Sequence, residues 1–192
     1  MKRLIISVAL NLLLLVATGF AQQPGAATTT TTTTTASTPE AAAIKAEAEN
    51  CSRAFMNGDF GKVIDLTYPK LFELGGGRAK VLAEVETQMK ELQNKGIKII
   101  SHAIGEPEQS VRAGGKLVAI VPIRLKMESP EYYIDLKSFW LAVSTDEGKL
   151  WRFVSGSSLD ENILKVLLPE VAGKIKLPEV KQPAVERKPA TP

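Results

Sequence analysis

The feature that most constrains this chain is a change of hydrophobic period at Gly96. Before this glycine, apolar residues recur at steps of three and four, which is the spacing of one helix face. After it, β-branched and aromatic residues form short runs, and the turns between the runs contain Gly114-Gly115, Ser129-Pro130 and Asp146-Glu147-Gly148. Helices followed by strands predict an α+β fold, because each kind of element then forms a layer of its own.

Three helices are expected in the first half of the chain: residues 40–56, a short helix that Asp59 caps, and residues 78–95. Residues 72–74 are expected to form a very short strand or an extended link. Because short turns separate the later strands, neighbouring strands should pair antiparallel. Residues 158–161 have the capping-box pattern that begins a short C-terminal helix. We therefore predict three N-terminal helices packed on one face of a curved antiparallel sheet, followed by that helix.

One folded unit with a tail at each end is expected from the composition. Residues 1–21 combine a positive start, an apolar run and small residues at the end, which is the pattern of a cleaved signal peptide. Residues 22–39 are rich in Thr and residues 173–192 in Pro, and neither offers enough apolar surface to offset the entropy of ordering. We expect a disordered linker over 22–39, a single domain over 40–172 and a disordered tail over 173–192.

The signal peptide predicts a secreted or periplasmic bacterial protein without a stable membrane anchor. The alternative is an uncleaved anchor, which needs about 20 apolar residues. The apolar run here is shorter than that and contains Ser7 and Asn11. Cleavage is therefore expected after Ala21.

Composition and charge exclude several classes of site. One Cys and one His cannot form a Cys/His zinc site or an intrachain disulfide, and we expect no metal and no cofactor. The net charge of +3 comes from the two ends, and residues 40–172 alone carry −2. Nucleic acid is not an expected partner, because it requires a basic stripe and usually interleaved aromatic residues.

The order of elements and a few short strings resemble the nuclear transport factor 2-like cone fold. The strings are Asn57-Gly-Asp-Phe60 between the first two helices, Tyr68-Pro-Lys-Leu-Phe-Glu-Leu-Gly-Gly76 before the long helix, and Trp151-Arg-Phe-Val154 at the end of the strands. The resemblance covers residues 40–168, and more narrowly the chain is similar to uncharacterised secreted bacterial members. It implies an apolar pocket between sheet and helices and frequent dimerisation through the sheet. Members of the superfamily include enzymes, binding proteins and proteins that are neither.

The resemblance also implies candidate site residues. Enzymes of the superfamily use a carboxylate after the second helix, and Glu73 lies in that region. Their helix-one tyrosine has no counterpart, because Phe55 and Met56 stand there. Tyr68, Glu73 and Trp140 are the candidate ligand-binding residues, with Glu73 as the candidate catalytic residue. By strand alternation His102 shares a wetter face with Lys98 and Ile100, and a surface position is expected for it.

Three other motifs have structural explanations. Residues 144–151 resemble an Asp-box hairpin, in which an aspartate binds backbone N–H groups above a tryptophan, and they predict a stapled turn. The glycines at 75–77 suit an anion site at a helix start or simply a flexible turn. Cys51 lies on the apolar face of the first helix and is expected to be a small buried hydrophobe.

These observations favour a secreted, non-catalytic binding module for a small apolar molecule or a protein partner. The alternative is a cofactor-independent dehydratase or isomerase that uses Glu73 with Tyr68. A homodimer through the sheet is also expected, because residues 132–144 are apolar on both alternations and one sheet face would lack a cover.

Export yields the first testable prediction. With cleavage after Ala21, N-terminal sequencing of protein recovered from the periplasm or the medium should begin at Gln22. A polypeptide that keeps Met1 and sediments with membranes would contradict this prediction.

Overall fold

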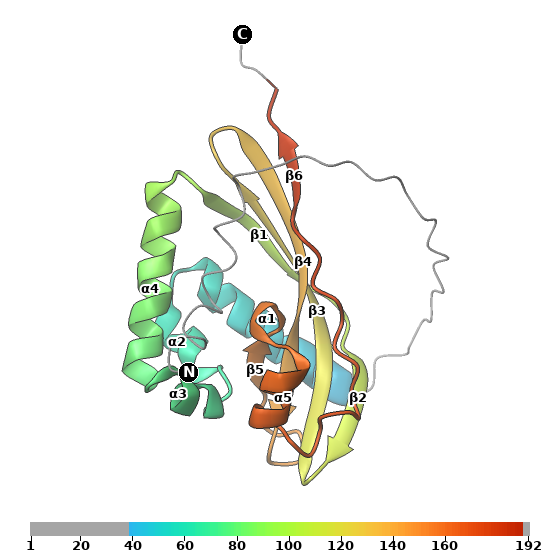
Figure 1. Cartoon of the computed structure of the whole chain (residues 1–192). Coiled ribbons are helices and arrows are strands. Elements are labelled where there is room, and N and C mark those ends of the chain that lie inside the picture. Colours follow the sequence, from blue (N-terminus) through green and yellow to red (C-terminus); the bar gives the residue numbers. More distant parts are fainter. Residues whose placement is uncertain (1–38, 190–192) are drawn as a thin grey trace, which may run out of the picture.

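The computed structural model describes residues 39–189 and has the predicted α+β class, with a six-stranded antiparallel sheet (Figure 1). The expectations for residues 1–38 and 190–192, including the signal peptide and most of the Thr-rich linker, lie outside the described residues. The elements are α1 (Pro39–Met56), α2 (Phe60–Asp65), α3 (Lys70–Gly75), α4 (Arg78–Asn94), β1 (Lys98–Ile104), β2 (Glu108–Ala113), β3 (Lys116–Glu128), β4 (Tyr132–Ser144), β5 (Arg152–Ser155), the 3₁₀ turn η3 (Gly156–Ser158), α5 (Glu161–Leu167) and β6 (Ala184–Arg187).

The sheet is built on the long hairpin of β3 and β4. These two strands pair continuously from Leu117 opposite Ser144 to Glu128 opposite Tyr133. On the other edge of β3, β1 and β2 pair one after the other, and β5 and β6 do the same along β4. Near its tip the hairpin therefore lies between β1 and β6, and at its open end it lies between β2 and β5.

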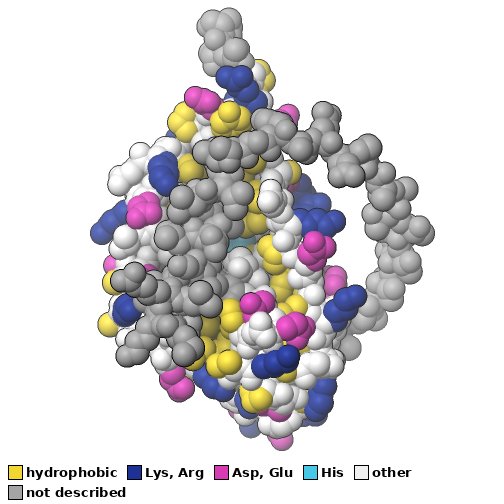
Figure 2. Space-filling view, viewed as in Figure 1, with side chains coloured by type: hydrophobic (Ala, Val, Ile, Leu, Met, Phe, Trp, Pro, Cys, Tyr) yellow, Lys and Arg dark blue, Asp and Glu magenta, His cyan; other side chains and the backbone are white. Residues whose placement is uncertain are grey.

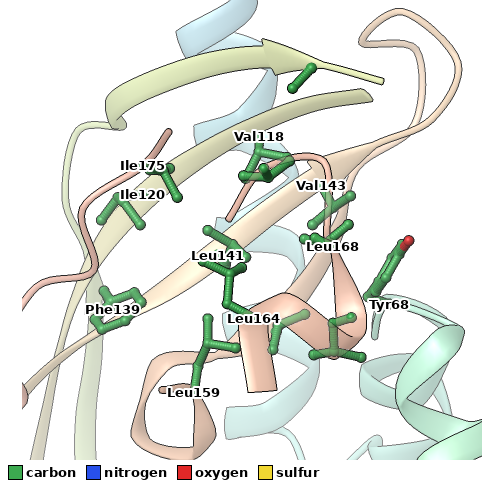
Figure 3. Packing of buried hydrophobic residues seen from close by; sticks show 14 residues of the cluster. Tyr68, Val118, Ile120, Phe139, Leu141, Val143, Leu159, Leu164, Leu168 and Ile175 are labelled. Carbon is green, nitrogen blue, oxygen red and sulfur yellow. The ribbon is translucent and has the colours of Figure 1, made fainter. Parts of the chain in front are cut away.

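Successive side chains of a strand point to opposite faces of the sheet, and residues opposite each other in an antiparallel pair point to the same face. Each face of the hairpin therefore carries its own hydrophobic core. The inner face, which α1 covers, packs Ala119 and Val121 against Ile44 and Ala48. The outer face, which α5 covers, consists of alternate residues of the same strands (Figure 3). Helices α1 and α5 accordingly lie on opposite sides of the sheet (Figure 1). The outer-face core includes Val118, Ile120, Phe139, Leu141, Val143, Leu164, Leu167 and Leu168.

The outer face differs from the expectation of an uncovered apolar surface. Phe139, Leu141 and Val143 are only 2%, 0% and 1% exposed, because α5 and the segment after it pack on them. Further along the hairpin, the outer face carries the ion pair of Arg124 and Asp135. The surface on which the homodimer prediction relied is thus inside the protomer. The homodimer itself stays a prediction.

A fourth helix precedes the sheet in the described chain. Residues 72–74, expected to be extended, belong to α3, so the prediction of a strand or link was wrong. Proline is tolerated at a helix start, and Pro69 has a helical φ of −59° as the N-cap. The helix ends at Gly76, whose φ of +85° favours glycine and whose N–H donates to the Phe72 carbonyl.

Side chains determine where two of the helices begin. Asp59 caps α2 as predicted, since the Lys62 N–H donates to its Oδ1 at 3.1 Å. The predicted capping box at residues 158–161 does not begin α5. Asp160 is the N-cap instead, and its Oδ1 accepts from the N–H groups of Asn162 and Ile163, both at 2.8 Å.

The Asp-box segment forms the predicted stapled turn between β4 and β5. The Asp146 carboxylate accepts the Leu150 N–H at 2.9 Å and the Ser144 hydroxyl at 2.8 Å. These hydrogen bonds lower the pKa of Asp146. Gly148 has a φ of +89°, and Trp151 is 2% exposed beneath the turn.

The C-terminal segment also differs from the prediction of a disordered tail. Ile175 is 3% exposed in the outer-face core, and Leu177 packs against the same core. Residues 184–187 then form β6 and pair with residues 132–135 of β4. Lys188 follows with an ion pair to Glu128 at 3.2 Å. Proline content alone was misleading here, because Ile175 and Leu177 pack on the sheet and residues 184–187 pair with β4.

We predict that this segment stabilises the domain. Ending the full chain at Ala172 should lower the midpoint of thermal unfolding, measured by circular dichroism, because the outer-face core loses Ile175 and Leu177. The matched control ends at Leu177 and keeps the side chains of Ile175 and Leu177. Its midpoint of thermal unfolding should fall much less. The single substitution Ile175→Ala should cost about 2–4 kcal/mol. Equal midpoints for the Ala172-ended and full-length chains would show that the segment does not contribute.

Candidate functional site

The structure does not bring the three sequence-predicted site residues together. Glu73 is exposed on α3. Tyr68 is 8% exposed and belongs to the outer-face core, whereas Trp140 packs beside the inner-face core. Because the sheet separates these two cores, Tyr68 and Trp140 cannot line one pocket.

Tyr68 lies beside a group of charged residues at the end of the outer-face core. Burial raises the pKa of its phenol, and nearby Glu170 and Glu73 act in the same direction while Lys116 opposes them. Lys116 and Glu170 form an ion pair in which both side chains are about three-quarters buried. Lys70 donates to the Leu167 carbonyl at 3.0 Å, next to the end of α5. These contacts attach α3 and the β2–β3 turn to α5, and they give Tyr68 a structural role.

A continuous series of rings crosses the inner side of the molecule. We call Phe60, Phe55, His102, Trp140 and Phe153 the aromatic row, and they come from α2, α1, β1, β4 and β5 in that order. Successive ring centroids are 6.3, 5.6, 5.0 and 5.3 Å apart, with edge-to-face or tilted geometry. Such contacts are favourable beyond the area they bury. All of the rings except Phe153 are only half-buried.

His102 belongs to this row because of a β-bulge in β1. Ile99 lies opposite Met127, Ser101 opposite Lys126 and His102 opposite Leu125, so Ile100 is an extra residue without a partner. One extra residue reverses the alternation of every side chain beyond it. The expectation of a wetter face for His102 was therefore wrong, and Ile100 is the residue left 50% exposed. Strand alternation in the sequence gave no signal for the bulge.

The imidazole of His102 is neutral in this environment. Burial lowers its pKa from 6.5 to about 4. Its Nδ1 atom is buried without a hydrogen-bond partner, and the same is true of Ser138 Oγ on β4. The backbone beside the ring is held in place, because the Ser52 hydroxyl of α1 donates to the His102 carbonyl at 3.0 Å.

A separate groove of about 620 Å³ lies between α1, α2 and the β4–β5 turn and is open to solvent. It contains none of the three predicted site residues, and its lining mixes both signs of charge. This groove is not the apolar pocket that the resemblance implies. Figure 2 likewise shows basic and acidic side chains interspersed over the visible face. The charged lining residues are Glu47, Asp59, Lys62, Asp65 and Arg152.

The glycine run at 75–77 forms a turn between two helices. Gly76 and Gly77 have φ values of +85° and +107°, which favour glycine. Arg78, which follows the run, forms an ion pair with Asp65. The turn interpretation accounts for these glycines.

Residues 39–189 contain no group of three or more His, Cys, Asp or Glu side chains placed to hold a metal ion. Over the same range, no helix has both the length and the apolar character that crossing a membrane requires.

Comparison with known proteins finds no match: no protein-family model matches the chain, and neither a curated protein nor a solved structure does. A neutral imidazole among aromatic rings suits the binding of an uncharged, flat molecule.

The burial of His102 predicts a specific pH dependence. Its pKa of about 4 in the folded chain lies below the unfolded value of 6.5, so between these values the unfolded chain takes up a proton that the folded chain does not. Stability contributed by the neutral ring is present above pH 6.5 and is lost as the pH falls towards 4, by up to about 3 kcal/mol.

Urea denaturation of the full chain at pH 7 and pH 4.5 measures this effect. The variant His102→Phe keeps a ring in the row and cannot titrate, so its stability should fall less than that of the wild type. Carboxyl groups titrate in both proteins and cancel in the comparison. The same loss of stability in both would contradict the assignment of a buried neutral imidazole.

Proposed function

We propose that the protein is a non-catalytic binding module that takes a small, flat, mainly apolar molecule against the aromatic row. The observation that carries this proposal is that five rings from five elements touch in series while four of them stay half-buried. The exposed parts of such rings are apolar area that a bound molecule can remove from water. Ligand sites are typically lined by aromatic side chains with few polar groups.

A small molecule fits this surface better than a protein partner does. Stable protein interfaces bury about 800 Å² on each partner. Four rings of the row are half-buried, and the groove lined by Asp59 and Gly61, the neighbours of Phe60, carries charges of both signs. A flat molecule can reach the faces of Trp140 and Phe55 without that area.

We propose further that the chain is a nuclear transport factor 2-like cone whose ligand surface is the inner face of the sheet. The order of helices before strands and the hairpin-based antiparallel sheet support this proposal. The additional helix α3 departs from the three helices expected. The pattern of residues 1–21 supports action outside the cytoplasm, in the periplasm or the medium.

The enzyme alternative has less support. A dehydratase or isomerase requires a carboxylate beside its substrate. Glu73 is exposed on α3 and acts electrostatically on Tyr68, which belongs to the outer-face core. The rings that contact His102 are those of Phe55 and Trp140, and neither can serve as a base.

The binding proposal can be tested with 2-naphthol as the probe. Titration of the full chain should shift the indole N–H signal of Trp140 in a ¹H–¹⁵N NMR spectrum. Trp151 is an internal control, because it is 2% exposed beneath the β4–β5 turn and should not respond. Trp140→Leu lacks the reporter indole, so its binding is followed by the fluorescence of 2-naphthol; it should be weaker by about tenfold or more, since the ring contact is removed.

Tyr133→Phe provides the matched control variant. Tyr133 is 44% exposed near the tip of the hairpin and lies outside the aromatic row. This variant should bind 2-naphthol as the wild type does. No response of either indole, or an equal loss of affinity in both variants, would overturn the proposed function.

A further inference from the structure

The groove between α1, α2 and the β4–β5 turn has the size of a small-molecule site. Its volume is about 620 Å³, and ligand pockets typically measure roughly 300–1,000 Å³. None of the five rings of the aromatic row belongs to its lining. The groove is therefore a second candidate site, which the proposed function leaves unused.

Backbone hydrogen bonds hold the walls of this groove together. The Asp59 N–H donates to the Ala54 carbonyl at 2.9 Å, which attaches the start of α2 to α1. The Phe153 N–H donates to the Leu66 carbonyl at 2.8 Å, which attaches the end of α2 to β5. A ligand thus meets a surface that is already formed, and less free energy is spent on ordering the groove when it binds.

Two of the carboxylates in the lining are already engaged within the protein. Oδ1 of Asp59 accepts the Lys62 N–H at 3.1 Å as the cap of α2. Asp65 forms an ion pair with Arg78. The other charged side chains of the lining are Glu47, Lys62 and Arg152.

These three side chains have charges that a ligand can reach. Within residues 39–189, no ion pair includes any of them. Glu47 accepts from the Asn50 side chain at the long distance of 3.5 Å. Nη1 of Arg152 donates to the Trp151 carbonyl at 2.9 Å, which leaves the other guanidinium N–H groups for a ligand. The groove therefore presents one carboxylate from α1 and two cations from α2 and β5.

This charge distribution favours a ligand that carries both signs. A lone carboxylate in the groove would meet Glu47, and a lone ammonium group would meet Lys62 and Arg152. Like charges brought together in this way weaken binding. A zwitterion avoids the problem, because each of its ends can face the opposite charge.

The lining also offers an apolar contact at a fixed position. Leu150 is 58% exposed, although it is a large apolar side chain. Its N–H donates to the Asp146 carboxylate at 2.9 Å, so the β4–β5 turn holds it in place. An apolar part of a ligand can remove this side chain from water.

We propose that the groove binds a short peptide with free ends, whose ammonium group faces Glu47 and whose carboxylate faces Arg152 and Lys62 while an apolar side chain covers Leu150. A guanidinium group suits a carboxylate, because it can donate two parallel hydrogen bonds to it. The site is separate from the aromatic row, so this proposal and the proposed function can hold or fail independently.

Three dipeptide probes test the proposal by isothermal titration calorimetry with the full chain. They are L-alanyl-L-leucine, its N-acetyl form, which lacks the ammonium group, and its C-terminal amide, which lacks the carboxylate. The free dipeptide should bind at least about fivefold more tightly than either blocked form, since each block removes one charge-assisted contact.

Variants in the groove should affect the probes selectively. Glu47→Gln should weaken binding of the free dipeptide by about fivefold and leave the N-acetyl form unchanged within about twofold. Arg152→Gln and Lys62→Gln should each weaken the free dipeptide by about threefold or more and leave the amide unchanged. Lys62 is exposed, so its variant keeps the test decisive if Arg152→Gln folds poorly.

Matched control variants make the same charge changes outside the groove. Glu49→Gln lies on α1 and Lys90→Gln on α4, both at exposed positions that do not line the groove. Both should bind the free dipeptide as the wild type does.

Each outcome decides the proposal. A preference for the free dipeptide that is lost only in the groove variants supports it. No binding of the free dipeptide, equal affinities for the three probes, or the same loss in the control variants would overturn it. If blocking only one end weakens binding, the groove takes a ligand with a single charge, and the proposal is likewise overturned.

Discussion

The pairing of β3 with β4 is the interaction on which the rest of the structure depends. The ladder runs without interruption from Leu117 and Ser144 to Glu128 and Tyr133, and every other strand attaches to one of its edges. Because side chains alternate along a strand, the apolar half of this hairpin presents two hydrophobic faces and requires a cover on each. Helix α1 supplies one cover, and α5 with Ile175 supplies the other.

The candidate site lies where the inner cover changes from complete to partial. Near Ala119 and Ala142, small residues let α1 pack closely on the sheet, and both are fully buried. Around Trp140 and His102, larger rings meet the C-terminal part of α1 through Phe55. Helix α4 stands beside α2 and α3 in Figure 1 and packs mainly against them. Since α4 packs mainly on those helices, the cover over the aromatic row is partial, and four of its rings are half-buried.

The residues of this site show how far sequence reasoning extends. Trp140 could be singled out because an aromatic residue in a strand marks either a core or a binding surface. His102 could not, because the bulge at Ile100 reverses the side on which it lies, and a bulge depends on pairing with β3. Tyr68 and Glu73 are close in sequence and interact, but Tyr68 belongs to the outer-face core and Glu73 is exposed on α3.

The sequence by itself determined the features that depend on local preferences. These are the α+β order, the antiparallel turns, the Asp59 cap and the Asp146 turn, since each follows from a few neighbouring residues. The tertiary structure alone decided that α5 and Ile175 cover the outer face, and that His102 faces Trp140. The physical reason is that burial of a face depends on segments far apart in the chain, which hydrophobic patterns within one segment do not specify.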